Sequence, residues 1–410
     1  MVDLVTNPSG AALALRSLLA PGVFAARCLK RTPRAIGVPS PRRSLVLAAK
    51  MALDELFFVS EVISAGLVSA TDTRRLVREV EDALTLYERR GWLDDPGSFH
   101  LVPPAPERFS FEGRRRAWLP GIRNLVFDHL TFDSGYAPHP GEPGRERWLG
   151  YETVRTAHAW LLQHPGPPRP WLVCVHAYRM GFPLADLLAF PADWFHRTLG
   201  LNVAFPVLPL HGPRKVGWRT GDGVFSGEVL DTVHMQAQAV WDIRRLLRWL
   251  RVERQAPTIG VYGLSLGGYT SALLASIESA VDCVVAGIPH ADYADLARWN
   301  MPSFILRFGS RLSIDWDVVA RVFRVVSPLA IAPRVPRERR YLFAASGDRL
   351  VPPGHARDLW IQWECPRATW YEGSHVSFGW EAAVYALLHE ALHATGLVPA
   401  LPVAPPAAAA

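Results

Sequence analysis

Three side chains in the C-terminal half of the sequence could together perform nucleophilic catalysis. Ser265 lies in a Gly-Leu-Ser-Leu-Gly segment, Asp348 in a Ser-Gly-Asp turn and His375 in a Gly-Ser-His loop. A serine hydroxyl is a poor nucleophile at neutral pH, so it needs a histidine that accepts its proton. The histidine in turn needs an acid that fixes its tautomer and stabilises the imidazolium. We therefore interpret Ser265 as a nucleophile, His375 as its base and Asp348 as the acid.

The residues around Ser265 predict a strand that turns directly into a helix. Residues 258–262 are β-branched and aromatic, whereas residues 269–276 are rich in alanine and leucine. Such a turn strains the backbone at the serine, and it needs small residues two positions before and two after, because strand and helix pass close together. Gly263 and Gly267 satisfy this requirement. With 31 glycines in the chain, however, the five-residue pattern also arises by chance. The surrounding sequence therefore has to decide whether Ser265 is a nucleophile or a turn residue.

Each of these residues, taken singly, also has a structural explanation. The serine could be a turn residue, the aspartate a helix cap, and the histidine one of 14 in the chain. If all three residues were structural, three separate strand ends would present a serine, an acid and a histidine in this order by chance. The order therefore favours a catalytic triad. Asp292 and Glu372 are the carboxylates that could replace Asp348 as the acid.

Strands and helices are expected to alternate from about residue 120 onward. The expected strands are 124–132, 171–177, 202–208, 258–263, 282–288, 340–346 and 368–373. The clearest helix between them, 228–251, has one apolar face. Buried strands separated by helices predict an α/β fold with a mostly parallel central sheet and chemistry at the carboxyl ends of its strands. The three candidate catalytic residues follow such ends.

Residues 120–395, about two-thirds of the chain, resemble the α/β-hydrolase superfamily through the motifs GLSLGG, SGDRLVPP and EGSHVSFG. The similarity is greatest to its dienelactone-hydrolase and prolyl-oligopeptidase-like branch, among abhydrolase domains. The resemblance implies an oxyanion hole built from the backbone NH groups of Leu266 and Tyr178. The family usually has a His-Gly pair after its third strand, whereas Ala177 stands in place of that glycine here.

A helical cap over the site is expected at residues 289–330, a long stretch between the sixth and seventh strands. Its aromatic residues would form a wall for an acyl or aromatic group, or else make ordinary core contacts. We expect His290, Trp299 and Phe304 to bind substrate. No second ligand at metal spacing accompanies His290, so no metal is expected, and no cofactor is implied.

The sequence divides into three parts. Residues 1–110 form an N-terminal helical extension, residues 111–396 the hydrolase domain, and residues 397–410 an Ala/Pro-rich tail that is expected to be disordered. Helices are expected at 45–67 and 73–90. Their apolar faces need cover, and the hydrolase domain is the expected partner.

Charge and cysteine usage narrow the choice of partners and of compartment. Residues 1–50 carry eight Lys/Arg and one Asp, a net +7, so the overall +6 leaves the rest at −1. A nearly neutral body argues against nucleic acid as a partner. The apolar stretch 11–26 is interrupted by Arg16 and is too short to span a membrane. Residues 1–40 either pack on the body, as we expect, or contact an anionic membrane surface weakly. Four cysteines without paired spacing favour a cytoplasmic setting.

The sequence thus predicts a serine hydrolase that cleaves a small-molecule carboxylic ester or thioester through an acyl-enzyme on Ser265. The same acyl-enzyme could be made from an amide or captured by an alcohol, so a peptidase and an acyltransferase remain alternatives. A binding protein that keeps the fold without turnover is the alternative from another class. Nothing in the sequence specifies an oligomeric state.

Overall fold

The computed structural model describes most of the chain. The described residues are 20–28, 30, 32, 35–64, 70–119, 122–225, 228–300 and 315–398, without the side chains of 62–64, 70–72 and 114–125. Two sequence predictions fall outside these residues. They are the substrate-binding role of Phe304 and the disordered tail from residue 399 onward. Among the helices that are described, none is long and apolar enough to cross a membrane.

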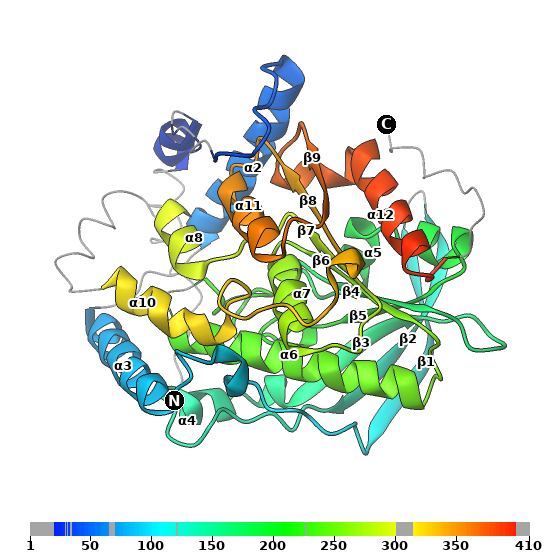
Figure 1. Ribbon diagram of the computed structural model, residues 1–410, viewed down its shortest axis with the longest axis horizontal. Coiled ribbons are helices and arrows are strands. Elements are labelled where there is room, and N and C mark those ends of the chain that lie inside the picture. The colour runs from blue at the N-terminus through cyan, green and yellow to red at the C-terminus, as the bar shows by residue number, and fades with distance from the viewer. Residues whose placement is uncertain are drawn as a thin grey trace.

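A nine-stranded sheet forms the centre of the molecule (Figure 1), in the order β1-β2-β3-β5-β4-β6-β7-β8-β9. The strands are β1 Phe109–Leu119, β2 Ile122–Asp133, β3 Thr156–Leu162, β4 Trp171–Val175, β5 Asn202–Pro206, β6 Ile259–Leu264, β7 Cys283–Gly287, β8 Arg340–Ala345 and β9 Arg367–Tyr371. Five of the eight strand pairs are parallel, and the pairs that link β1, β2, β3 and β5 are antiparallel. The predicted mostly parallel sheet is therefore confirmed.

Two strands were missed by the sequence analysis. β1 contains three consecutive arginines and follows a proline-rich stretch, a composition that is typical of a connector. β3 is rich in alanine and leucine, which favour helices. Both belong to the antiparallel part of the sheet, where pairing with β2 overrides weak local preferences.

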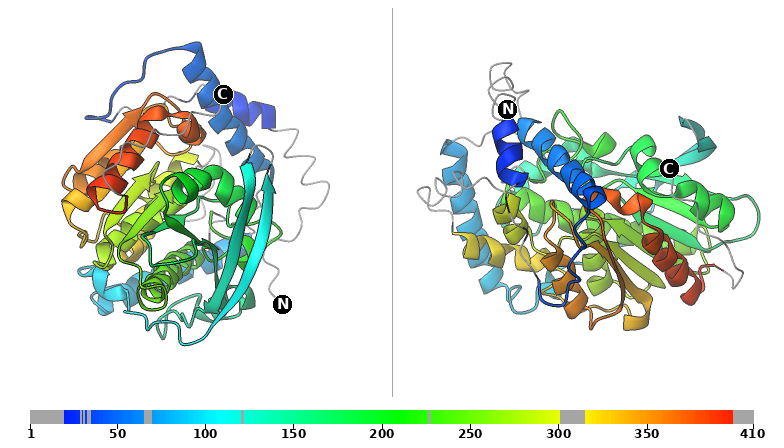
Figure 2. Two further views of the ribbon diagram at one scale, coloured as in Figure 1. Left: turned by 90° about the vertical axis from the view of Figure 1, so that its right-hand side faces the viewer. Right: turned by 90° about the horizontal axis from the view of Figure 1, so that it is seen from above.

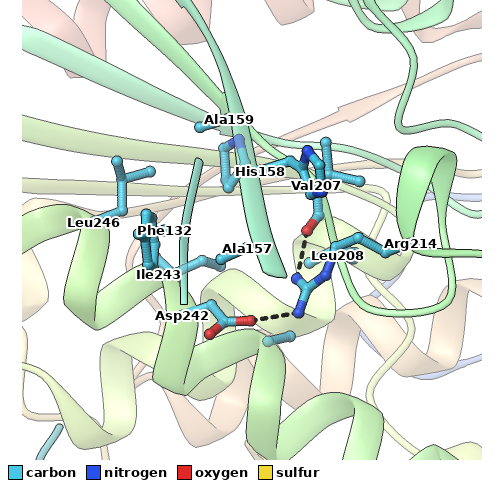
Figure 3. A pocket seen from close by; sticks show the side chains of 12 residues that line it. Phe132, Ala157, His158, Ala159, Val207, Leu208, Arg214, Asp242, Ile243 and Leu246 are labelled. Carbon is cyan, nitrogen blue, oxygen red and sulfur yellow. Dashed lines mark hydrogen bonds and ion pairs between the residues drawn. The ribbon is translucent and has the colours of Figure 1, made fainter. Parts of the chain in front are cut away.

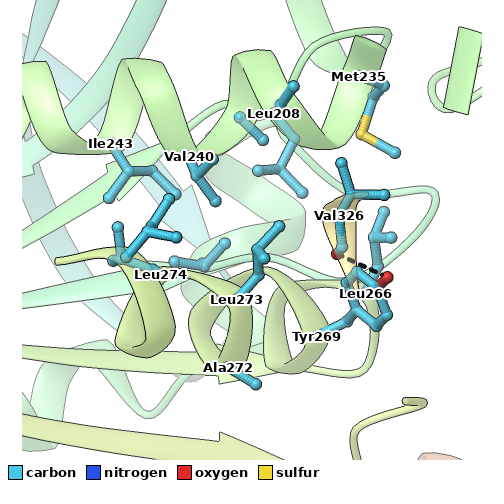
Figure 4. Close-up of a cluster of buried hydrophobic side chains, with 14 of the residues drawn as sticks. Leu208, Met235, Val240, Ile243, Leu266, Tyr269, Ala272, Leu273, Leu274 and Val326 are labelled. Carbon is cyan, nitrogen blue, oxygen red and sulfur yellow. Dashed lines mark hydrogen bonds between the residues drawn. The ribbon is translucent and has the colours of Figure 1, made fainter. Parts of the chain in front are cut away.

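Helices cover both faces of the sheet. The helices are α2 Leu45–Ser64, α3 Ala70–Arg89, α4 Arg145–Leu149, α5 Pro183–Ala189, α6 Val229–Val252, α7 Leu266–Ile277, α8 Tyr293–Asn300, α10 Trp316–Phe323, α11 Pro353–Gln362 and α12 Ala382–Ala394. Side chains of α3, α6, α7 and α11 enter one buried cluster, and side chains of α5 and α12 enter the other. Figure 4 shows α6 and α7 packed through residues such as Val240, Ile243 and Leu273.

The two N-terminal helices pack in opposite ways. On α3 the expected apolar face is buried in the main core, with Leu76, Val80 and Leu86 among its members. On α2 the expectation is wrong, because Asp54 is fully buried whereas Leu56 is 56% exposed. Figures 1 and 2 show α2, in blue, beside the orange segment that carries β8 and β9. Asp54 and Glu55 of α2 face this segment and bind to Arg349 in it.

Candidate active site

Ser265 occupies the turn between β6 and α7. Its backbone is strained, with φ of 53° and ψ of −108°, a region that residues other than glycine rarely adopt. A Cβ atom on Gly263 would lie 2.0 Å from the carbonyl oxygen of Gly267, and one on Gly267 would lie 1.9 Å from that of Val175. Both positions therefore admit only glycine, as the sequence predicted, and the turn holds the Ser265 side chain above the edge of the sheet.

The three candidate catalytic residues lie within hydrogen-bond distance of one another. Nε2 of His375 is 2.9 Å from Oγ of Ser265, and Nδ1 of His375 is 2.6 Å from Oδ2 of Asp348. An ionised carboxylate only accepts hydrogen bonds, so Nδ1 carries the proton and Nε2 is free to accept one from the serine. The second oxygen of Asp348 accepts the backbone NH groups of Leu350 and Val351, at 2.9 and 2.7 Å.

The electrostatics around His375 favour its protonated form. Burial of the ring lowers the pKa of His375, but the charge of Asp348, the hydrogen bond to it and the charge of Asp54 together raise the pKa above the usual value. An imidazolium formed when the serine loses its proton would be stabilised in the same way.

The two alternative acids lie elsewhere. Glu372 is more than half exposed and has Arg42 as its ion-pair partner, at 3.8 Å. Asp292 accepts the backbone NH of Asp295 at 2.9 Å, as a helix-capping residue does. Asp348 is thus the carboxylate that the fold brings to His375.

The two NH groups expected to form an oxyanion hole come from the start of α7 and the loop after β4. Leu266 is the first residue of α7, and the NH groups of a helix's first turn have no acceptor within the helix. The carbonyl of Ala177 accepts from Nδ1 of His176 at 2.8 Å and from the NH of Met180 at 3.3 Å. Because a trans peptide points its NH away from its carbonyl, these bonds fix the direction of the Tyr178 NH.

The two hydrogen bonds of His176 require a neutral ring, because one nitrogen donates and the other accepts. Its Nε2 accepts the backbone NH of Leu208 at 3.0 Å, which leaves the proton on Nδ1. Burial lowers the pKa of His176 to about 4, so the ring stays neutral at physiological pH. Ala177 is accommodated in place of the family's glycine because, in the described part of this loop, the positive φ angles fall on Arg179 and Gly181.

Asp54 of α2 is a site residue that sequence reasoning missed. Its Oδ2 accepts the backbone NH groups of Arg349 and His375, at 2.9 and 3.0 Å, and its Oδ1 that of Val376 at 3.1 Å. Burial, followed by the nearby charge of Asp348, raises the pKa of Asp54 to about 6. In the sequence the only signal was a charged residue on an otherwise apolar helix, and it indicated no partner.

Aromatic rings gather around Tyr269, one helical turn after Ser265. The ring of His290 is stacked on Tyr269, with centroids 4.5 Å apart, and meets Tyr293 edge-on at 4.7 Å. Phe225 contacts both His290 and the ring of Tyr178. Within the described residues, Nε2 of the buried His290 has no hydrogen-bond partner. Burial keeps the pKa of His290 well below its usual value, so the ring is neutral.

Trp299 is engaged with the N-terminal segment. Its indole NH donates to the carbonyl of Arg349 at 3.1 Å, and the ammonium of Lys30 lies 3.7 Å from the centre of its ring. The ring is therefore covered from the side of residue 30. Phe304, the third residue expected to bind substrate, lies outside the described residues.

Two hollows of the described structure lie away from the triad, which lines neither of them. One, of about 280 Å³, lies among α7, α8 and α10 and is lined by Tyr269, Tyr293 and Phe323 together with Asp292 and other polar residues. It includes part of the segment 289–330 for which the sequence predicted an apolar wall, and residues 301–314 of that segment lie outside the described residues.

The other hollow, of about 10 Å³, lies between the sheet and α6 (Figure 3). Arg214 lines it and pairs with Asp242 at 2.8 Å while donating to the carbonyls of Val207 and Val154. This space is about the smallest that holds one water molecule, and the residues around it form a buried structural network. Among the described residues, no group of three His, Cys, Asp or Glu side chains is placed to hold a metal ion.

Comparison with known proteins identifies two relatives over most of the chain. The uncharacterized protein MT2702 of Mycobacterium tuberculosis is 40% identical over 368 residues, and the uncharacterized protein Rv2627c of another strain is 39% identical over the same length. Each match covers 88% of this chain and 86% of the relative. No protein-family model matches the sequence.

Solved structures resemble the chain more distantly. An acetyl xylan esterase from Paenibacillus sp. is 16% identical, with a TM-score of 0.49, over 69% of this chain and 88% of that chain. The acylaminoacyl peptidase of Pyrococcus horikoshii is 14% identical, with a TM-score of 0.42, over 57% of this chain and 38% of that chain. These values are too low to bear on activity.

The fold assignment therefore rests on features of the chain itself. These are the strand order, with β5 inserted between β3 and β4, and the strained serine between β6 and α7, and they agree with the α/β-hydrolase fold that the sequence motifs predicted. The chain belongs to one family with the two mycobacterial proteins.

Proposed function

We propose that the protein is a serine hydrolase that cleaves a carboxylic ester or thioester through an acyl-enzyme on Ser265. The observation that carries the proposal is the continuous hydrogen-bonded series from Ser265 through His375 to Asp348. A serine at a helix start usually caps the helix, but Ser265 makes no side-chain capping bond. Its hydroxyl is instead directed at a buried base, as nucleophilic catalysis requires.

Acylation follows from the proton positions in this series. Oγ of Ser265 attacks the acyl carbon as its proton moves to Nε2 of His375, while Nδ1 keeps its proton and its bond to Asp348. The resulting oxyanion accepts hydrogen bonds from the NH groups of Leu266 and Tyr178. One such donor stabilises the transition state by about 3 kcal/mol. The imidazolium then gives its proton to the leaving alcohol or thiol.

Deacylation repeats these steps with water as the nucleophile. His375 takes a proton from the water as the oxygen attacks the acyl carbon, and it returns the proton to Ser265 when the acid leaves. No step needs a cofactor. Every proton transfer uses the same Nε2 atom, so turnover depends on the orientation of one imidazole ring.

The aromatic residues beside Ser265 favour a small organic substrate. Phe225 contacts the rings of both Tyr178 and His290, and the Nε2 atom of His290 has no partner within the described chain. A neutral imidazole in such a place suits a substrate that carries a polar group next to its apolar part. His290 is thus a substrate-binding residue in this proposal. Trp299, whose ring contacts Lys30 of the N-terminal segment, is a second one.

The compartment is part of the proposal. All four cysteines are free thiols, and Cys174 and Cys283 are buried in the sheet. Free thiols persist where the surroundings are reducing, which supports the cytoplasm. A small-molecule ester fits this setting.

Labelling with a fluorophosphonate probe tests the nucleophile directly. The wild-type chain is expected to be labelled at Ser265, and Ser265→Ala is expected to lose both labelling and hydrolysis of 4-nitrophenyl acetate. The fold should stay intact, because the change is small and Ser265 makes no capping bond. Labelling of the alanine variant at another serine, or no labelling of the wild type, would overturn the proposal.

A substrate panel separates the alternatives that share an acyl-enzyme. Nitrophenyl esters of rising chain length, the matching thioesters and peptide amides would be compared at equal enzyme concentration, with and without an added alcohol. Faster cleavage of amides would make the protein a peptidase, and transfer to the alcohol in preference to water would make it an acyltransferase. A chain that binds these compounds without turnover would be a binding protein.

A further inference from the structure

One helix of the N-terminal extension contacts both halves of the proposed catalytic machinery. Asp54 and Glu61 are seven residues apart on α2, which places them on the same side of the helix and about 10 Å apart. Asp54 binds the backbone of the acid turn and of the histidine loop. Glu61 binds the loop that carries Tyr178.

The contact at Asp54 joins two strand ends. The acid turn follows β8 and the histidine loop follows β9, and the Asp54 carboxylate accepts NH groups from both. Both of its oxygens act only as acceptors. A carboxylate can satisfy all three donors, whereas an amide would turn an NH₂ group toward one of them. The geometry is therefore specific for an ionised side chain.

The contact at Glu61 holds a strained loop. Arg179, directly after Tyr178, has φ of 68°. Its guanidinium donates to Glu61 at 2.7 Å, to Asp222 at 2.5 Å and to the carbonyl of Thr220 at 2.8 Å. Glu61 also accepts from Arg219 at 3.0 Å. The strained residue next to Tyr178 is thus held by two carboxylates, Glu61 of α2 and Asp222.

A buried ion-pair network holds α2 in place between these two contacts. Glu55 accepts from Arg27 at 2.7 Å and from Arg349 at 2.8 Å. Arg349 also donates to the carbonyl of Arg27, and Lys50 pairs with Glu381 at 2.5 Å. Directional bonds of this kind determine the position of a helix more narrowly than apolar contacts do.

We propose that Asp54 and Glu61 are positioning residues, and that α2 is a two-point clamp that sets the spacing between the histidine loop and the oxyanion loop. The inference rests on the proposed serine hydrolase function and extends it to the N-terminal extension. Asp54 acts through the orientation and the charge of His375, and Glu61 acts through the Tyr178 peptide. Neither touches the reacting atoms.

The test compares Asp54→Asn and Glu61→Gln in the full-length chain, with 4-nitrophenyl acetate and the fluorophosphonate probe. Asp54→Asn is expected to lower kcat about 10- to 100-fold with KM nearly unchanged, as for a small misplacement of a catalytic group. It should also move the acidic limb of the kcat/KM profile to lower pH. The groups that act on His375 are Asp348 and Asp54, and the variant removes one of these two negative charges.

Glu61→Gln is expected to lower kcat about 3- to 10-fold without moving the acidic limb, because Glu61 acts on the oxyanion side. Glu146→Gln is the matched control. It removes one carboxylate of an exposed ion pair on α4, and wild-type kinetics are expected. If Asp54→Asn does not fold, Asp54→Ser takes its place in the same assays.

The outcomes separate this proposal from the one it rests on. A wild-type chain that is not labelled by fluorophosphonate would remove the hydrolase proposal and this one with it. A wild type that is labelled, with Asp54 and Glu61 variants that keep its kcat and pH profile, would overturn the clamp alone. A lower kcat in the Asp54 variant with an unmoved acidic limb would also contradict the role given to its charge.

Discussion

Helices α2 and α7 both lie beside the candidate site but differ in what they bury. All 12 residues of α7 are buried, and most of them are apolar or small. On α2 the described buried residues are Leu47 and Val59 together with the charged Asp54 and Glu55, while Leu45 and Leu56 are largely exposed. Apolar packing against α6 and the sheet holds α7, whereas α2 combines a smaller apolar contact with hydrogen bonds and ion pairs. One helix follows the proposed nucleophile and lies in the core, and the other makes directional contacts to two loops.

Both helices begin at a serine, and the two serines behave differently. Oγ of Ser44 accepts the backbone NH of Leu47 at 3.0 Å, which is the usual capping bond at the start of a helix. Ser265 stands at the same position of α7 without such a bond. Its backbone turns the hydroxyl away from the helix and toward His375. The comparison indicates that the strained turn, and not the residue type, directs the hydroxyl of Ser265 toward His375.

The largest expected effect compares the two carboxylates that act on His375. Asp348→Asn should lower kcat by about four orders of magnitude, because an amide at this position leaves His375 in the wrong tautomer. Asp54→Asn, on α2, should cost no more than about 100-fold. The measurement is the rate of 4-nitrophenyl acetate hydrolysis by both variants.

Equal losses at the two positions would break the distinction between a catalytic acid and a positioning residue. A drop below tenfold in Asp348→Asn would instead point to another acid. Asp292→Asn and Glu372→Gln are the variants to compare in that case, and neither is expected to reduce the rate, since both side chains have partners away from His375.

A second prediction concerns how much one leucine on each of these two helices contributes to the free energy of unfolding. Leu273→Ala removes a fully buried side chain from α7 and should lower the free energy of unfolding by about 2–5 kcal/mol. Leu56→Ala removes a leucine whose side chain is more than half exposed on α2 and should change it by less than about 0.5 kcal/mol. Urea unfolding followed by circular dichroism measures both.

A loss of more than about 1 kcal/mol in Leu56→Ala would mean that the outer face of α2 is covered in solution. The same outcome would agree with the burial of the apolar face of α2 that helical periodicity alone predicts.

The contrast between the two helices also shows what the sequence could predict. The strand, the turn and the helix around Ser265 were predictable because their signals are local: a β-branched run, two obligatory glycines and an alanine-rich run within 19 residues. Asp348 and His375 were predictable because each follows a strand of its own. A site built from strand ends can be predicted in this way without knowledge of any tertiary contact.

Asp54 and Glu61 lacked any such signal. The NH groups that Asp54 binds are 295 to 322 residues away in the sequence. Helical periodicity in α2 showed which residues are apolar, but the face that is buried depends on the partner, and Arg349 and two loop backbones offer polar groups. The strands β1 and β3 were missed for a related reason, since pairing with β2 overrides their composition.

A third prediction follows from the pKa of Asp54. Burial raises this pKa to about 6 in the folded chain, from an ordinary value of 3.8. Between these two pH values the folded state binds more protons than the unfolded state, so stability falls as the pH rises. The span of about two pH units corresponds to about 3 kcal/mol. Buried histidines such as His176 act in the opposite direction, because their pKa is lowered to about 4.

The difference between the wild type and Asp54→Asn isolates this effect. The wild type should lose about 3 kcal/mol relative to the variant as the pH rises from 4 to 7, measured by urea unfolding at each pH. A difference that is independent of pH would mean that Asp54 titrates normally. The three backbone NH groups that Asp54 accepts would then fully offset the cost of burying its charge.

The smallest expected effect compares the two serines. Ser44→Ala removes a helix cap and should lower the free energy of unfolding by about 1 kcal/mol, with hydrolysis retained. Ser265→Ala removes no cap, so it should leave the free energy of unfolding within about 0.5 kcal/mol of the wild type while hydrolysis is lost. Urea unfolding and 4-nitrophenyl acetate hydrolysis, measured on the same preparations, give both quantities. A Ser265→Ala variant as destabilised as Ser44→Ala would show that Ser265 also caps its helix. Its hydroxyl would then be shared between the α7 backbone and His375, and the distinction drawn between the two helix starts would fail.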